Sequence, residues 1–264
     1  MGVQMETKSR NVKLKVRHVH KTYDDKVILG DISFDVMEGE FLAVLGLSGC
    51  GKTTLLRILI SLEKQDSGTI EMEGREISKL APSQRGMGII FQNYALFPNM
   101  TVLSNVEYAL KRRKETAKTA RETALHVLEQ LGMHEHLNKK PRQLSGGQQQ
   151  RVAIARTLAM NPDIILLDEP ISALDVTNRE IMKKELKEIQ QKFHTTMIFI
   201  THEQEEAFYL ADRIMVMSEG AIEQLDTPNQ IFKHPANAYV KDFVVAHLEQ
   251  KYQSLLKCTG REKF

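Results

Sequence analysis

Short apolar runs alternate with amphipathic stretches along most of the chain. The run 41–45 (FLAVL) is continuous and apolar, which is typical of a strand buried on both faces of a sheet. Further short apolar runs occupy 86–91, 163–168, 196–201 and 213–218. Between the runs 163–168 and 196–201, residues 179–193 place Ile181, Leu186, Ile189 and Phe193 near one helical face. Strands that alternate with helices predict a parallel sheet in an α/β domain.

The first forty residues follow a different pattern. Val12, Leu14 and Val16 alternate with basic residues, which predicts a half-buried strand. Apolar residues alternate again at 32, 34 and 36, just before the Glu38-Gly39 turn. The two strands predict a small antiparallel β subdomain at the N-terminal end of the α/β core.

The middle of the chain interrupts the strand–helix alternation. Residues 101–160 contain helix-like stretches and no convincing strand. Residues 116–131 carry apolar side chains every three or four positions, and Gly132 is a suitable stop. We expect an inserted α-helical subdomain over about 93–160. A last short helix is expected over 237–252, and the polar residues from Lys257 are expected to fray.

Composition and charge narrow the class of protein. The 264 residues suit one large domain or two small ones, and a net charge of +2 gives no strong field toward nucleic acid or membrane. No apolar run approaches the roughly 18 residues that span a bilayer, and residues 1–10 lack the apolar segment of a secretory signal. Two cysteines cannot form a disulfide framework. We therefore expect a cytoplasmic, reduced protein.

A glycine-rich segment between the run 41–45 and a predicted helix matches the pattern G-x-x-x-x-G-K-[ST]. Its glycines let backbone N–H groups turn toward a phosphate, and the following helix adds its positive end. Lys52 supplies a charge for the β- and γ-phosphates, and the Thr53 hydroxyl is a ligand for Mg²⁺. Chance produces this pattern on the order of once in a hundred chains of this length. The predicted nucleotide-binding residues are Gly46, Leu47, Ser48, Gly49, Cys50, Gly51, Lys52, Thr53 and Thr54.

Two acids end the buried run 163–168. Asp168 stands at the strand terminus and Glu169 follows it. Two buried acids would be costly without a cation nearby, so Asp168 is a candidate ligand in the Mg²⁺ shell and Glu169 a candidate general base for water. The alternative is a solvated strand end, which the neighbouring phosphate loop makes less favourable.

A second glycine-rich helix start lies further along the chain. Ser145, Gly146, Gly147 and Gln148 precede a predicted helix over 149–160, so they form a second candidate anion-binding site. Alone, this segment would indicate only a turn and a helix cap.

Together these motifs make the chain resemble the ATPase subunits of ABC transporters over about residues 12–245. GLSGCGKT is similar to Walker A, LSGGQ to the signature, and IILLDE to Walker B; Gln92, Asp175 and His202 match the Q-loop, D-loop and switch histidine. The resemblance implies a P-loop NTPase (RecA-like) core within an ABC ATPase domain over 12–235. Residues 236–264 would then be a short C-terminal helical extension with a frayed tail.

The resemblance also implies roles for these residues. Two subunits, identical or similar, would form a head-to-tail dimer in which each ATP lies between Walker A of one subunit and Ser145–Gln148 of the other. Glu169 would be the general base, His202 would contact the γ-phosphate, and Gln92 would link Mg²⁺ and the attacking water to the transport partner. Asp175 would cross the dimer interface, and Tyr23 would stack on adenine. A strand-edge aromatic is the plainer interpretation of Tyr23, and a surface histidine that of His202 alone.

The segment after Gln92 carries several apolar residues in a proline-containing loop. Tyr94, Leu96, Phe97 and Met100 suggest an exposed apolar patch, where the family receives the coupling helix of its membrane permease. The alternative is a loop that packs on its own domain. The segments YALFPNMTV, THEQEEA and HPANAYVKDF resemble importers of the polyamine, iron, phosphonate and maltose type. Many subunits of that branch continue into a β-barrel regulatory domain near the point where this chain stops, so regulation through such a domain is not expected.

Several alternatives remain open. A soluble ABC ATPase that acts on ribosomes or DNA is the main one, although the 53 residues from Gln92 to Ser145 leave no room for a long coiled coil. Cys50 is either a small loop side chain or an acidic thiol. His134 and His136 are two residues apart, which would split them across a helix and argues against a metal site. We expect ATP and Mg²⁺ as cofactors, a membrane permease and indirectly a substrate-binding protein as partners, no nucleic acid, and a place on the inner face of the membrane.

Overall fold

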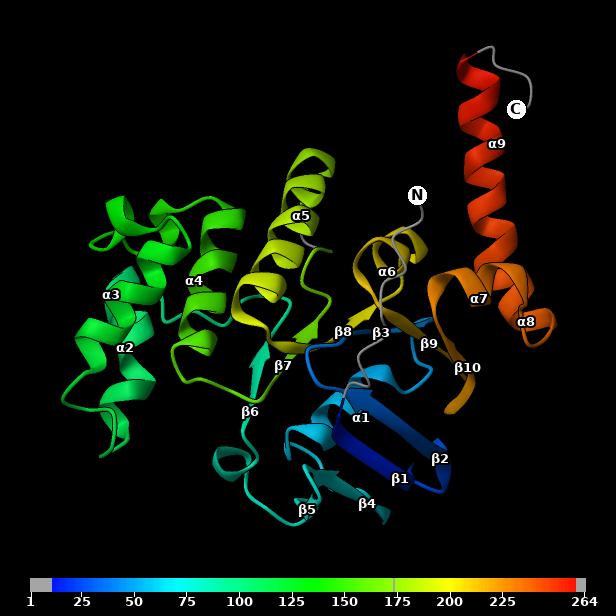
Figure 1. Ribbon diagram of the computed structural model, residues 1–264, viewed down its shortest axis with the longest axis horizontal. Helices are drawn as coiled ribbons and strands as arrows, with labels where there is room; N and C mark the ends of the chain where they lie inside the picture. Colours follow the sequence, from blue (N-terminus) through cyan, green and yellow to red (C-terminus); the bar gives the residue numbers. More distant parts are fainter. Residues whose placement is uncertain (1–10, 173, 260–264) are drawn as a thin grey trace, which may run out of the picture.

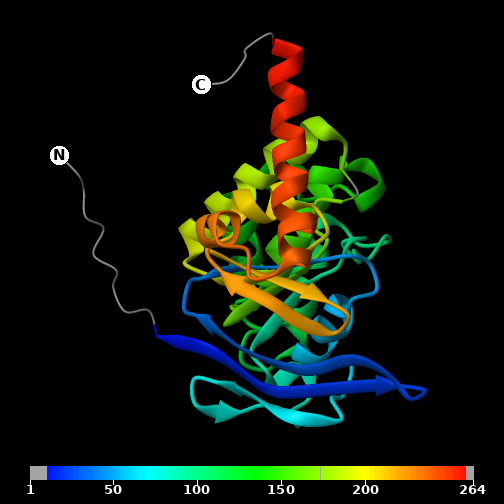
Figure 2. The same ribbon diagram turned by 90° about the vertical axis from the view of Figure 1, so that its right-hand side faces the viewer.

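The structure, a computed structural model, describes residues 11–172 and 174–259. Its two sheets lie one beneath the other, with a helical layer at one side of the larger sheet (Figures 1 and 2). The predicted fold class is confirmed: an α/β core, an N-terminal antiparallel sheet and a group of inserted helices are all present.

The smaller sheet has the order β2-β1-β4-β5 and is antiparallel. Apolar side chains alternate with polar ones along its two long strands, so one face is buried. The strands are β1 (Val12–Tyr23), β2 (Lys26–Met37), β4 (Ser67–Met72) and β5 (Arg75–Glu76).

The larger sheet has the order β10-β9-β3-β8-β7-β6. Its strands run parallel except for β10, which forms an antiparallel hairpin with β9. The strands are β3 (Phe41–Gly46), β6 (Met87–Ile90), β7 (Ile164–Asp168), β8 (Thr196–Thr201), β9 (Arg213–Ser218) and β10 (Ala221–Asp226). Every residue of β3 is buried, as its continuous apolar pattern predicts.

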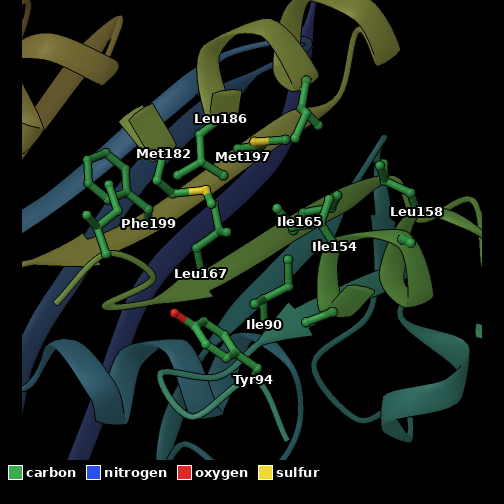
Figure 3. Close-up of a cluster of buried hydrophobic side chains, with 14 of the residues drawn as sticks. Ile90, Tyr94, Ile154, Leu158, Ile165, Leu167, Met182, Leu186, Met197 and Phe199 are labelled. Atoms are coloured by element: carbon green, nitrogen blue, oxygen red, sulfur yellow. The ribbon is translucent and has the colours of Figure 1, made fainter. Parts of the chain in front are cut away.

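Each face of the larger sheet has its own core. Alternate residues of β3 separate between them: Phe41, Ala43 and Leu45 pack on the helical side, whereas Leu42 and Val44 pack toward α1 (Lys52–Leu59) and the smaller sheet. Figure 3 shows part of the helical side, where Met182, Leu186 and Ile154 from helices meet Ile165, Leu167 and Phe199 from strands. The sheet edge that carries the loops is therefore fixed from both sides.

Three helices interrupt the α/β alternation and lie together at one end of the molecule (Figure 1). They are α2 (Val102–Arg112), α3 (Ala120–Gln130) and α4 (Gly146–Leu158). The helix predicted over 116–131 begins later, at Ala120, and ends as expected before Gly132, which has a φ of 69°. Single 3₁₀ turns occur at Pro82–Gln84, His134–His136 and Pro141–Gln143.

The remaining helices cover the core and then leave it. α5 (Val176–Phe193) and α6 (Gln204–Leu210) follow β7 and β8. After β10 come α7 (Pro228–Lys233), α8 (Ala238–Val240), a π-helical stretch (Lys241–Ala246) and α9 (His247–Thr259). The predicted single helix over 237–252 is divided among α8, the π-helical stretch and α9, and it continues to Thr259. Helix α9 projects away from the rest of the molecule in both views (Figures 1 and 2).

Candidate functional site

Four parallel strands bring the predicted site residues to one edge of the larger sheet. Leu45 of β3 pairs with Thr201 of β8, Ile200 with Asp168 of β7, and Leu167 with Ile90 of β6. Ligands bind at the carboxyl ends of strands in such sheets. The chain segments that follow these ends are the Walker A-like loop, His202, Glu169 and Gln92, in that spatial order.

The glycine-rich loop is held tightly between β3 and α1. Gly51, the residue before α1, has a φ of 101°, and a Cβ there would lie 2.7 Å from the Ile28 carbonyl oxygen. Glycine is therefore required on both conformational and steric grounds. The first turn of α1 carries no acidic residue and no side-chain cap, so its backbone N–H groups remain suited to an anion.

Lys52 folds back over this loop. Its Nζ donates to the carbonyl oxygens of Gly46 (2.7 Å) and Leu47 (2.9 Å), and the residue is buried. A buried ammonium needs such partners. A phosphate bound in the loop would offer Lys52 a charged acceptor in place of these neutral ones.

The two acids after β7 have different environments. Burial and the charge of Glu169 raise the pKa of Asp168, against the opposite effect of Arg57 and Lys52. A carboxyl held in this way gains from a divalent cation, which would offset both causes. Within the described residues no group of three or more His, Cys, Asp or Glu side chains could hold a metal by itself. The donor set therefore fits a cation that also uses hydroxyl, amide and phosphate oxygens.

Glu169 adopts a backbone conformation that is uncommon for a non-glycine residue. Its φ is 46°, its N–H donates to the Ile200 carbonyl (3.2 Å), and its carbonyl accepts from the Ser172 hydroxyl (3.0 Å). Such strain persists only where neighbours enforce it, and it occurs preferentially at functional sites. Here it turns the side chain to within 3.2 Å of His202 Nδ1.

Gln92 reaches the same cluster from β6. Its Nε2 donates to the Ser172 hydroxyl at 2.9 Å, and that hydroxyl donates to the Glu169 carbonyl. The structure thus joins Gln92, Ser172 and Glu169 in one hydrogen-bonded chain. Sequence reasoning named the first and last of these; Ser172 belongs to the segment Ser172-Ala-Leu-Asp175 that matches the D-loop. Ala173 in that segment lies outside the described residues.

Tyr23 ends β1 with its ring 42% exposed. The Lys21 ammonium lies 4.9 Å from the ring centroid. A ring exposed to this extent is free to accept a flat aromatic ligand on its surface. Its predicted role in stacking adenine is compatible with this placement and stays a prediction.

The signature-like segment forms a reciprocal cap at the start of α4. Ser145 Oγ accepts from the Gln148 N–H (3.3 Å), while Gln148 Oε1 accepts from the Ser145 N–H (3.0 Å). Gly146 and Gly147 lie between them. Among the described residues, no hydrogen bond or ion pair joins this segment to the Gly46–Thr53 loop. One chain therefore carries two separate helix starts that are candidates for binding an anion.

Asp175 caps the next helix. Its Oδ1 accepts from the Asn178 N–H at 3.0 Å at the start of α5, and these bonds lower the pKa of its carboxyl. The side chain is exposed. The local role is a helix cap, and its expected place in a dimer interface stays a prediction.

The predicted exposure of one loop residue is wrong. Tyr94, expected with Leu96, Phe97 and Met100 to face a membrane partner, is 6% exposed and lies in the core shown in Figure 3. Its backbone has a φ of 60°, which turns the ring inward toward Gln150. Leu96 also packs against the core. The apolar spacing alone could not show which side chains of the loop turn inward.

A groove lies beside this loop, between the core and the inserted helices. It has a volume of about 660 Å³ and is lined mainly by apolar residues of β6, α2, α4 and the end of α1, including Phe97. Phe97 packs on Tyr108 of α2, with ring centroids 4.6 Å apart. Arg156 of α4 donates to the carbonyls of Tyr94 (2.9 Å) and Ala95 (2.7 Å), and buried Asn105 bonds to Phe97. Sequence reasoning missed Arg156 and Asn105, because their partners are distant or backbone atoms.

The C-terminal segment packs against β9 and α6, the elements beside the site. The Tyr239 hydroxyl lies 3.4 Å from the Met217 carbonyl, its ring stacks on Phe243, and burial raises its pKa. Gln204 donates to the Phe243 carbonyl (3.0 Å), and Lys251 of α9 pairs with Glu205 (3.1 Å). The segment HPANAYVKDF indicated a relationship in the sequence, yet nothing in it revealed these contacts.

Comparison with known proteins identifies the class. Residues 29–172 match the family described as ABC transporter. The chain is 44% identical over 235 residues to the "Spermidine/putrescine import ATP-binding protein PotA" of Acetivibrio thermocellus, which covers 89% of the chain and 67% of that relative. It is 49% identical over 214 residues to the "Fe(3+) ions import ATP-binding protein FbpC 2" of Rhizobium meliloti, which covers 81% and 54%. The chain thus spans about half to two thirds of the length of these curated relatives.

Solved structures agree with the sequence matches. The ATP-binding cassette MJ0796, in a dimeric post-hydrolysis state bound to ADP and Pi, superposes with a TM-score of 0.69 at 35% identity and covers 81% of this chain and 98% of that one. The cbiO1 protein of Clostridium perfringens, part of the ABC transporter complex cbiONQ, gives a TM-score of 0.79 at 28% identity over 92% and 99%. Fold and site define a nucleotide-binding P-loop ATPase domain. The chain belongs to the ABC transporter family, which confirms the resemblance drawn from its motifs.

Proposed function

We propose that this chain hydrolyses ATP to power import through a separate membrane permease. One observation carries the proposal: a single sheet edge presents a phosphate loop, a half-buried acid pair and the 3.2 Å contact between His202 and Glu169. A phosphate loop alone would support binding. The additional acid held next to a histidine supports hydrolysis.

The residues divide the work in the following way. The loop N–H groups, the start of α1 and Lys52 would bind the β- and γ-phosphates, with Ser48 and Thr54 beside them. Thr53, Asp168 and Gln92 would hold Mg²⁺, which neutralises charge on the phosphate oxygens when bound. Glu169 would orient the attacking water and accept its proton. His202 would keep Glu169 in place and contact the γ-phosphate.

A second subunit would complete the site. The capped turn Ser145–Gln148 is exposed or half-buried, and its place at a helix start suits an anion. In the described part of the chain it makes no hydrogen bond or ion pair with the phosphate loop. A two-fold head-to-tail pair would bring each turn to the other subunit's ATP. The partner would be an identical chain or a similar ATPase subunit, with Asp175 at the interface. The dimeric arrangement of MJ0796 supports this proposal.

The groove beside Phe97 would receive a short helix of the permease. Its volume, apolar lining and half-buried Phe97 and Met100 favour an amphipathic segment. Within the described residues, no helix has the length and apolar character that crossing a membrane requires. The permease would thus be another chain, and this subunit would lie on the inner face of the membrane, with a substrate-binding protein acting indirectly. Relatives named for spermidine/putrescine and Fe(3+) import favour a cationic cargo.

A co-purification experiment tests the proposal. The tagged chain would be isolated from mildly solubilised membranes of its native host, together with Phe97→Asp and, as a matched control, Phe232→Asp, which alters an aromatic residue exposed on α7. We expect a polytopic membrane protein to accompany the wild type and the control, and to be lost with Phe97→Asp. Recovery of ribosomal or nucleoid proteins without a permease would contradict the proposal and favour a soluble ATPase.

A further inference from the structure

His136 contacts the signature-like turn directly. It is the last residue of the 3₁₀ turn His134–His136, between α3 and α4, and its Nε2 lies 3.0 Å from Nε2 of Gln148. The ring is half-buried, and its Nδ1 is buried with no hydrogen-bond partner among the described residues. Sequence analysis assigned no role to this histidine.

The hydrogen bonds around Gln148 fix the protonation state that this contact needs. Gln148 Oε1 accepts from the Ser145 backbone N–H at 3.0 Å, and a backbone N–H can only donate. The amide orientation is therefore set, and its NH₂ group faces His136. For a bond to form, the His136 Nε2 must accept, so the imidazole is neutral and carries its hydrogen on Nδ1.

Protonation of His136 is incompatible with the two hydrogen bonds of the Gln148 amide. The protonated ring has a donor at Nε2, which faces the NH₂ donor of Gln148. If the amide turns over to offer its oxygen to the ring, its NH₂ group faces the Ser145 N–H, and the cap loses one of its two bonds. Either the His136 contact or the cap is lost.

We propose that His136 is a positioning residue: the neutral imidazole holds the Ser145–Gln148 turn in the conformation that receives phosphate, and the protonated imidazole does not. ATP-driven closure of the dimer would therefore weaken in acid. The inference rests on the proposed function in one respect, because it assumes that this turn meets ATP in a partner subunit. It deepens that function by assigning a pH-sensitive regulation to the site. His136 itself does not touch the nucleotide.

Among the described titratable and charged side chains near this turn, His136 is the one that contacts the Gln148 side chain. On its own segment these are Glu135, Lys139 and Lys140, and α3 carries His126 and Glu129 nearby in sequence. On α4, Arg151 follows Gln148 by one turn but already pairs with Glu185 of α5. On α2, buried Glu107 pairs with Lys111 and Arg121. Within the described residues no carboxylate bonds to either ring nitrogen of His136.

The first test needs neither ATP nor a dimer. In the ligand-free chain with ¹⁵N-labelled histidine, the His136 signal, assigned by its loss in His136→Gln, should show a protonated Nδ1 and an unprotonated Nε2 at about pH 8. In acid, once the ring is protonated, the Ser145 backbone amide should exchange faster with solvent. A hydrogen on Nε2 at the higher pH, or a Ser145 amide indifferent to pH, would overturn the inference.

The second test measures closure. In a Glu169→Gln background, which should trap ATP, we expect dimerisation at about pH 8 to be roughly tenfold stronger than at about pH 5.5, because each of two turns loses one hydrogen bond. His136→Gln keeps an acceptor that cannot titrate and should remove this part of the pH dependence, whereas His136→Leu should dimerise weakly at both values. His134→Gln, at the exposed neighbour, is the matched control and should behave like the parent.

The two tests separate failure of the inference from failure of the proposed function. Other titrating groups, His202 among them, are present in every variant and cancel in the comparison. If the parent dimerises but His136→Gln keeps the full pH dependence, the inference is wrong. If ATP produces no dimer at any pH, the proposed function fails, and the ring and amide signals still decide what His136 does to the turn.

Discussion

His202 Nδ1 lies 3.2 Å from Glu169 Oε1, across the boundary between β8 and β7. Each residue follows the end of a different strand, and the strained backbone of Glu169 turns its side chain toward the histidine. A carboxylate that accepts from Nδ1–H directs the other ring nitrogen outward. The pair can therefore orient water and contact phosphate at the same time.

Glu169→Gln should leave ATP binding intact and lower turnover by about 10²–10⁴-fold, the usual contribution of a general base. Glutamine keeps the size of the side chain but cannot take a proton from water. Phosphate release and nucleotide affinity measured together would check this. Normal hydrolysis in this variant would exclude Glu169 as the base.

Lys52→Ala should abolish hydrolysis and weaken ATP binding. The substitution removes the charge for the phosphates and both loop contacts, to the Gly46 and Leu47 carbonyls. Steady-state hydrolysis and nucleotide titration test it, with Lys64→Ala, an exposed lysine beyond α1, as the control. Wild-type turnover in Lys52→Ala would refute the assignment of the phosphate loop.

Asp168→Asn should stabilise the ligand-free chain while removing its response to Mg²⁺ and ATP. The pKa of Asp168 is raised from 3.8 by burial and by Glu169, so the folded chain keeps a proton that the unfolded chain has already lost. The free energy of unfolding contributed by this group therefore falls as pH rises above 3.8, and the loss is complete above the raised pKa. Asparagine does not ionise and avoids it.

Thermal unfolding at about pH 4 and about pH 7 would measure this effect. We expect Asp168→Asn to unfold at a higher temperature than wild type at the higher pH, because asparagine avoids the cost of ionising a half-buried carboxyl. The gain should shrink at the lower pH. A variant that is less stable than wild type at neutral pH would contradict the argument.

Cys50 should react slowly with an alkylating reagent, and ATP should block the reaction. The thiol is buried inside the phosphate loop, with Sγ 3.9 Å from the Lys52 ammonium. A Cys258→Ser background leaves one thiol, and mass spectrometry follows its modification. Equal labelling with and without nucleotide would count against the predicted position of the phosphates.

Tyr239→Ala should reduce both stability and ATP affinity, although Tyr239 lies outside the known motifs. The substitution removes the stacking on Phe243 and the contact with the Met217 carbonyl on β9. For a half-buried ring this should lower the free energy of unfolding by about 2 kcal/mol. Tyr239→Phe keeps the ring and should be nearly normal. Denaturant unfolding and nucleotide titration distinguish support of the loop from general destabilisation, which would leave affinity unchanged.

Local patterns predicted the parts of the molecule that depend on local rules. The run 41–45 is a strand buried on both faces, and the glycine pattern after it forms the turn into α1 because φ and steric requirements act within a few residues. These are short-range consequences of sequence. The gathering of Gln92, Glu169 and His202 at one edge depends on the strand order β8-β7-β6, which sequence analysis did not predict.

The residues that sequence analysis misplaced or overlooked owe their positions to contacts between distant segments. Tyr94 is polar at one end and sits in a loop, yet a left-handed backbone turns it into the core. Tyr239 and His136 gain their significance from Met217 and Gln148, which no spacing rule connects to them. Only the packing of the inserted helices and the C-terminal segment brings these residues together.

Helix α4 connects the signature-like turn to the groove. Ser145 is its N-cap, and near the other end of the helix Arg156 donates hydrogen bonds to the loop that borders the groove. A helix of 13 residues is about 20 Å long. Any tilt of about 10° at the nucleotide end would displace the groove end by about 3 Å, since the helix is one rigid rod of that length. Under the proposed function, the length of α4 would set the spacing between ATP and the permease. A single residue added to or deleted from α4 would then change both the length of the helix and the rotation of one end relative to the other.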